Sequence, residues 1–164
     1  MDSFAPSAIA LSPIFAISVV LTASRSPVPD DQLNSVRRLV LIACAAQLLH
    51  LLEESAFDLH VVLPEAFGFP GMSLPFFLSI NTGALVVWLL GALQRTFNPL
   101  VVTTFWFLGL ASVFNLVAHP TMAIVTGGYF PGVLTSPLVG FTGLLLTRRL
   151  FQATGDALGS GPAA

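Results

Sequence analysis

The chain contains no lysine and has little charge of either sign. Only 9% of its 164 residues are charged, against roughly 25% in a typical soluble domain. Six arginines are its only permanent cations, and eight residues are acidic. Nucleic-acid binding needs a basic surface and disorder needs a high charge content, so both classes are excluded. The single cysteine, Cys44, excludes an internal disulfide bond.

The few charges are also unevenly placed. Residues 3–24, 66–94 and 96–147 include no Asp, Glu, Lys or Arg, while 55% of the whole chain is hydrophobic. A soluble domain of this size could not cover its surface with so few charges. The sequence therefore predicts an integral membrane protein that crosses the bilayer several times.

Five segments approach the roughly 20 apolar residues that a helix needs to cross a membrane. We expect these helices at about residues 8–23, 37–57, 74–94, 99–119 and 131–147. The pair Asn98-Pro99 is typical of a helix start, and Pro131 could start the last helix in the same way.

The expected fold is an all-α integral membrane protein with a bundle of five transmembrane helices. Residues 1–36 supply an N-terminal helix and a loop, residues 37–150 form a four-helix domain, and residues 151–164 form a flexible tail. The first helix could instead be a cleaved signal peptide, but it lacks a basic start and carries Asp2, so we favour a retained helix.

The arginines predict the orientation of the bundle. With five crossings, all of them fall on one side: Arg25, Arg37, Arg38, Arg95, Arg148 and Arg149. The positive-inside rule makes this side and the C-terminus cytoplasmic. The loops at residues 58–73 and 120–130 then lie on the opposite side, where we expect His60 to face water.

Three polar residues interrupt the second expected span. His50, Glu53 and Glu54 lie at positions i, i+3 and i+4, so they share roughly one face of a helix. Counted at 1.5 Å per residue from Arg38, His50 lies about 18 Å into the membrane and Glu54 about 24 Å.

Two further segments place polar residues at a similar depth. Asn115 and His119 share a face of the fourth span, about 24 and 30 Å above Pro99. Thr135 lies about 20 Å above Arg148, and Tyr129 about 28 Å if the helix reaches that far. The sequence therefore predicts one polar site shared by three segments.

Adjacent carboxylates are costly inside a membrane. With no arginine or lysine on their side, they can be protonated, share charge with a histidine, or bind a metal cation. The metal-ligand candidates suit zinc or non-haem iron: His50, Glu53, Glu54 and His119. The candidate catalytic residues are Glu53, Glu54, Asn115, Tyr129 and Thr135.

Simpler interpretations exist for each of these residues. Either acid could extend to the interface, and His119 could face headgroups at a helix end. Asn115 could only bond between helices, and Tyr129 could belong to an interfacial aromatic belt.

The polar residues also form three ordered motifs: His50-x-x-Glu53-Glu54, Asn115-x-x-x-His119 and Tyr129-x-Pro131-Gly132-x-x-Thr135. In this order they resemble the HXXEE domain, a family of small multi-helix membrane proteins of unknown function. The resemblance covers about residues 39–150 and implies a four-helix membrane domain whose motif residues suggest an enzyme. It names no substrate and no metal.

We expect a membrane-embedded enzyme, with or without a metal, that acts on a lipophilic small molecule such as an isoprenoid, sterol or acyl lipid. Hydrolysis, oxidation, and proton-transfer isomerisation or cyclisation all remain open. The alternatives are an intramembrane carrier of protons, ions or lipids, and a structural accessory protein. Membrane lipids are the expected surroundings, and the oligomeric state stays open.

Overall fold

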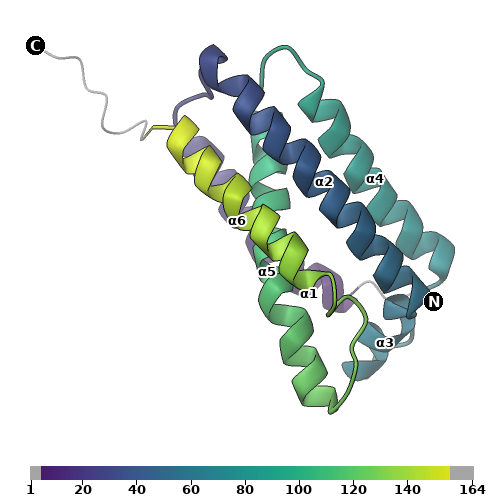
Figure 1. Ribbon diagram of the computed structural model, residues 1–164. Coiled ribbons are helices and arrows are strands. Elements are labelled where there is room, and N and C mark those ends of the chain that lie inside the picture. The colour runs from purple at the N-terminus through teal and green to yellow at the C-terminus, as the bar shows by residue number, and fades with distance from the viewer. Residues whose placement is uncertain (1–4, 156–164) are drawn as a thin grey trace, which may run out of the picture.

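Six α-helices and a short 3-10 helix make up residues 5–155, the part of the chain that the computed structural model describes (Figure 1). In chain order they are α1 (Ala5–Ala23), η1 (Asp30–Gln32), α2 (Leu33–Ala56), α3 (Leu59–Ala66), α4 (Leu74–Ala92), α5 (Pro99–Thr126) and α6 (Ser136–Ala153).

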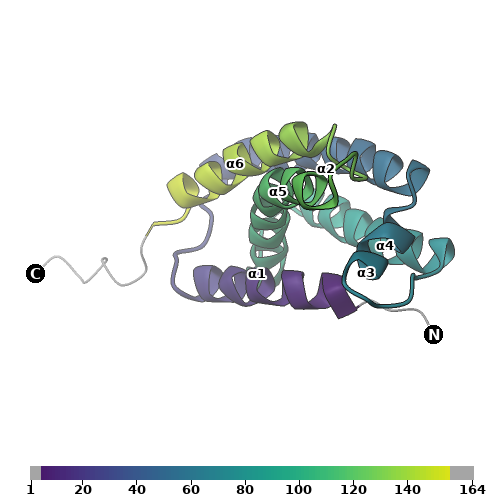
Figure 2. The same ribbon diagram turned by 90° about the horizontal axis from the view of Figure 1, so that it is seen from below.

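Helix α5 is the centre of the bundle. It packs most extensively against α6 and also contacts α1, while α2 packs against α6 and α4. Figure 2 shows α1 on the opposite side of α5 from α6, with α3 and α4 together at one end of the view. The side chain of Asn98 accepts a hydrogen bond from the Val101 amide, so the expected N-cap of α5 is confirmed.

Within residues 5–155, four helices are long and apolar enough to cross a membrane: α1, α2 together with η1, α4 and α5. They confirm the prediction of an all-helical chain with several candidate spans. Helix α5 continues to Thr126, so His119 lies inside the helix and not at its end.

The expected helix start at Pro131 is wrong, because α6 begins only at Ser136. From there to Thr147 the helix rises only about 18 Å before it reaches two arginines. Residues 127–135 are non-helical, and Phe130, Pro131 and Gly132 among them are buried. Non-helical backbone at membrane depth is tolerated where protein buries it or where it lines a cavity.

Three arginines hold the same end of the bundle together. Arg25 donates to the Thr154 carbonyl at 2.9 Å, and Arg149 donates to Ser35 at 2.8 Å. Arg37 donates to the Ala92 carbonyl at 2.6 Å and to the Gln94 carbonyl at 2.8 Å. The ends of α1, α4 and α6 therefore meet the start of α2, as the arginine pattern predicts.

The segment between α2 and α4 differs from the expected solvated loop. It contains α3, in which His60 is 7% exposed, so the prediction that His60 faces water is wrong. Leu59, on the same helix, is buried as well, which shows that α3 packs against the bundle. Of the expected tail, residues 151–153 belong to α6, and residues 156–164 lie outside the described part.

Close contact between α5 and α6 generates a stability prediction. A Cβ atom at Gly143 would lie 2.5 Å from the Ser112 Cβ and 2.7 Å from the Gly109 carbonyl oxygen. We expect Gly143→Ala to lower the free energy of unfolding by about 1–3 kcal/mol, because the helices must separate. Gly83→Ala is the matched control, since no atom lies within 4 Å of its added Cβ. Equal thermal midpoints of the two variants in detergent would contradict this packing.

Candidate metal centre

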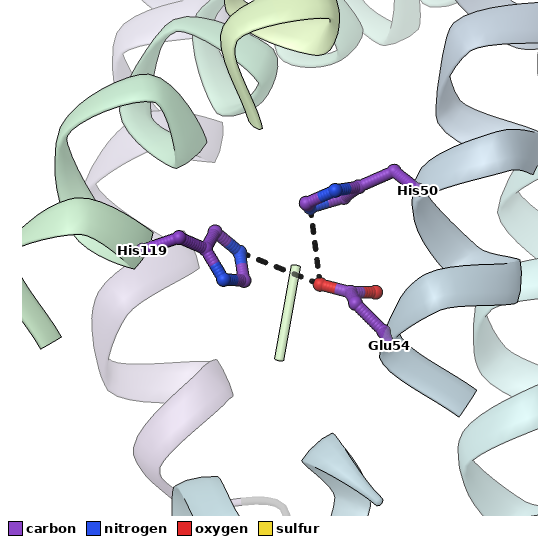
Figure 3. Close-up of side chains that lie close together, drawn as sticks. All are labelled: His50, Glu54 and His119. Atoms are coloured by element: carbon purple, nitrogen blue, oxygen red, sulfur yellow. Dashed lines mark ion pairs between the residues drawn. The ribbon is translucent and has the colours of Figure 1, made fainter. Parts of the chain in front are cut away.

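Three buried side chains from two helices converge on one point. His50 and Glu54 project from α2, and His119 projects from α5 (Figure 3). The Glu54 Oε1 atom lies 3.1 Å from the His50 Nε2 and 3.4 Å from the His119 Nε2. One ligand atom of each residue lies within 4.8 Å of the others. Their side chains are almost completely removed from the surface, with the whole residues 0–6% exposed.

The hydrogen-bond partner of the His119 Nδ1 determines which nitrogen of a neutral ring carries the proton. Its Nδ1 lies 2.6 Å from the Pro131 carbonyl oxygen, which can only accept a hydrogen bond. The proton of a neutral ring is therefore on Nδ1. The Nε2 then presents a lone pair to Glu54.

The protonation of His50 follows from a chain of two hydrogen bonds. The Thr135 hydroxyl donates to the Glu53 Oε2 at 2.5 Å, so its single proton is committed. The His50 Nδ1 lies 2.7 Å from that hydroxyl oxygen and must be the donor. Its Nε2 is thus also a lone pair, and the amide nitrogen of Asn115 lies 3.3 Å from it.

Two imidazole lone pairs and one carboxylate oxygen therefore face one another in a buried space. Acceptors in such contact repel unless a cation or a proton lies between them. In tetrahedral zinc coordination, ligand atoms about 2.1 Å from the metal are about 3.4 Å from each other. The two distances to Glu54 agree with this spacing, and all three pairs of ligand atoms lie within 4.8 Å. Two histidines and a carboxylate also suit non-haem iron.

Glu53 has a different environment from its neighbour Glu54. Its carboxylate accepts hydrogen bonds from the Tyr129 hydroxyl at 2.6 Å and the Leu134 amide at 3.0 Å. The amide and hydroxyl of Thr135 donate to the other oxygen at 2.8 and 2.5 Å. All four donors belong to residues 129–135, so Glu53 holds this non-helical segment against α2.

Gly132 allows the same segment to approach both histidines. Its φ of 92° lies in a region that favours glycine. A Cβ atom there would lie 2.6 Å from the His119 Nδ1 and 2.9 Å from the His50 Cε1. Any side chain at this position would displace the rings.

A large cavity opens beside the cluster. Its volume is about 780 Å³, and residues from α1 to α5 and Phe130 line it. Glu54, Asn115 and His119 are part of the lining, whereas most other lining residues are apolar. This volume lies within the range of about 300–1,000 Å³ for small-molecule sites.

The structure brings together all the residues that the sequence singles out, in two linked groups. His50, Glu54, His119 and Asn115 surround the point of convergence, whereas Glu53, Tyr129 and Thr135 hold the segment behind it. The Pro131 carbonyl is a partner that sequence reasoning missed. The only sign of its role in the sequence was that Pro131 and Gly132 are adjacent within the third motif.

Comparisons with known proteins identify the family. A family model described as a protein of unknown function with an HXXEE motif matches residues 41–146, and the chain therefore belongs to this family. The resemblance inferred from the three motifs is thereby confirmed. No curated protein and no solved structure matches the chain.

The two adjacent acids should respond in opposite ways to the same substitution. In Glu53→Gln an amide group replaces an acceptor of backbone N–H donors, so we expect the free energy of unfolding to fall by about 1–3 kcal/mol. In Glu54→Gln the amide can donate to an imidazole lone pair, so the metal-free protein should keep or gain stability. Thermal unfolding of both variants after treatment with a chelator measures the difference. A larger loss in Glu54→Gln would contradict the assigned environments.

Proposed function

We propose that this member of the HXXEE family is a membrane-embedded metalloenzyme that acts on a lipophilic substrate. The observation that carries the proposal is the convergence of the His50 and His119 lone pairs on the Glu54 carboxylate. Both opposite ring nitrogens are already committed as donors, to Thr135 and to Pro131. A divalent cation would satisfy all three atoms at once, whereas the Asn115 amide donates to the His50 Nε2 alone and leaves the Glu54 Oε1 and the His119 Nε2 without a donor.

The ligands of this proposed site are His50, Glu54 and His119, with zinc and iron as the fitting metals. A metal with three protein ligands supplies Lewis-acid chemistry or activation of water at its open positions. The Thr135 hydroxyl and the Pro131 carbonyl fix the two imidazole rings, which is a common role of groups that bond to metal-ligating histidines.

One residue next to the cluster, Asn115, is suited to contact the substrate. The amide of Asn115 lies beside the His50 Nε2 and lines the cavity, so it can orient an oxygen atom of a bound molecule. Glu53 and Tyr129 act as positioning residues. The hydrogen bond between them joins α2 to the segment at residues 127–135, and neither residue lines the cavity.

The proposed setting is a bilayer that α6 and the loop at residues 127–135 cross as a fifth segment. The arginine end faces the cytoplasm by the positive-inside rule. The metal centre then lies toward the opposite side. A lipophilic substrate reaches the cavity from the bilayer, since the cavity walls are mainly apolar.

A proton carrier is the second candidate, because Tyr129, Glu53, Thr135 and His50 form a continuous hydrogen-bonded chain. This hydrogen-bonded chain does not reach the arginine end of the bundle. Toward that end the cavity lining includes the aromatic residues Trp88 and Phe107, which do not relay protons. Proton flux into liposomes that depends on Glu53 would favour the carrier over the enzyme.

Metal content tests the proposed function. We expect about one zinc or iron per purified chain, measured by elemental mass spectrometry after exchange into metal-free detergent buffer. His50→Ala, Glu54→Gln and His119→Ala should each lower the content at least tenfold, because loss of one of three ligands removes a metal bond.

His60→Ala is the matched control for this measurement. His60 is a buried histidine whose Nδ1 has no partner among the described residues, and it lies outside the cluster. The control should retain the metal. A metal content that is zero in the wild type, or equal in all variants, would contradict the proposal.

A further inference from the structure

The cavity beside the cluster is almost free of charge. Among the lining residues that belong to the described part of the chain, Glu54 alone is formally charged, and no arginine is present. Away from the proposed metal, a phosphate group of a ligand would bury its negative charge without a cationic side chain to pair with it. The part of the cavity below the cluster therefore favours uncharged groups.

Two amide side chains add polarity deeper in the same cavity. Within the described residues, Gln47 of α2 makes no hydrogen bond. On α4, the amide nitrogen of Asn81 donates to the Phe77 carbonyl at 2.9 Å, but its oxygen has no partner there. Both amides are half-buried and border the cavity, so a polar atom of a bound molecule can supply the hydrogen bonds that they lack.

The two amides lie at the same depth. The hydrogen bond from Arg37 to the Ala92 carbonyl places these two residues, on α2 and α4, at the same depth in the bundle. Gln47 is ten residues above Arg37, about 15 Å, and Asn81 is eleven residues from Ala92, about 16 Å. Gln47 is also seven residues below Glu54, so the amide pair lies about 10 Å below the cluster.

From the amides toward the arginine end, the cavity is lined by three aromatic side chains, Phe15, Trp88 and Phe107. Phe107 packs edge-on against Phe15, with ring centroids 6.0 Å apart. It also contacts the tilted ring of Trp88, with centroids 6.5 Å apart. Trp88 lies only four residues, or about 6 Å, from Ala92. The space between the amides and these aromatic side chains accommodates a short apolar end of the ligand.

From these features we infer that the cavity binds a lipid with two polar groups about 10 Å apart, of which the one farther from the cluster is uncharged. One group lies at Glu54, Asn115 and His119, and the other lies between Gln47 and Asn81. The inference rests on the proposed function, because it makes this molecule the substrate of the same site.

Two hydroxylated chains of equal polarity test the spacing. In an extended chain, with about 1.2 Å per bond, eight bonds span about 10 Å. We therefore choose 1,9-hexadecanediol and, as its matched competitor, 1,3-hexadecanediol. Equal amounts of both are added to the purified full chain in detergent, and the bound diols are quantified by mass spectrometry.

We expect the wild type to retain about five times more 1,9-diol than 1,3-diol, the effect of one additional hydrogen bond. The double variant Gln47→Leu/Asn81→Leu should lose this preference, whereas Gln94→Leu, an exposed residue outside the cavity, should keep it. Equal binding of the two diols by the wild type would overturn the inference. An unchanged preference in the double variant would also overturn it.

The competition is repeated with the wild type after treatment with a chelator, which removes the proposed metal and leaves every side chain in place. Because the amides lie about 10 Å away from the cluster, the preference for the 1,9-diol should persist after this treatment. A wild type that is purified without metal and still prefers the 1,9-diol counts against the proposed function alone. A wild type with metal but no preference counts against this inference alone.

Discussion

Three hydrogen-bond acceptors face one another inside the helical bundle: the Nε2 atoms of His50 and His119, and the Oε1 of Glu54. In the low dielectric of a protein interior this contact is repulsive unless a cation or proton lies between the atoms. The hydrogen bonds at the opposite ring nitrogens prevent either ring from turning away without loss of a buried partner. This constraint is why the three side chains could hold a metal ion.

Glu53 holds the neighbouring non-helical segment at residues 127–135 against α2. Four donors from this segment bond to the one carboxylate, and Gly132 lets the backbone lie against both histidines. Adjacent residues on a helix point about 100° apart. Glu53 therefore faces this segment, while Glu54 faces α5. Glu53 holds the segment against α2, and Glu54 belongs to the cluster with the two histidines.

Much of the arrangement could be predicted from the sequence. The rise of an α-helix placed Glu54 and Asn115 at the same depth of about 24 Å, and the arginines marked one end of the bundle. The late start of α6 could not be predicted, because residues 131–147 are as apolar as a membrane helix. Their conformation depends on bonds to Glu53, which is far away in sequence. The burial of His60 was missed for a similar reason, since the packing of α3 depends on tertiary contacts.

The protonation of the two histidines is the most direct measure of the central claim. Nitrogen-15 NMR of histidine-labelled protein in lipid bilayers, with His60→Ala to simplify the spectrum, reports each ring nitrogen separately. His50 and His119 should both carry a proton on Nδ1 and none on Nε2, and added zinc should shift both Nε2 signals. A proton on either Nε2, with no response to zinc or iron, would contradict the convergence of lone pairs on Glu54.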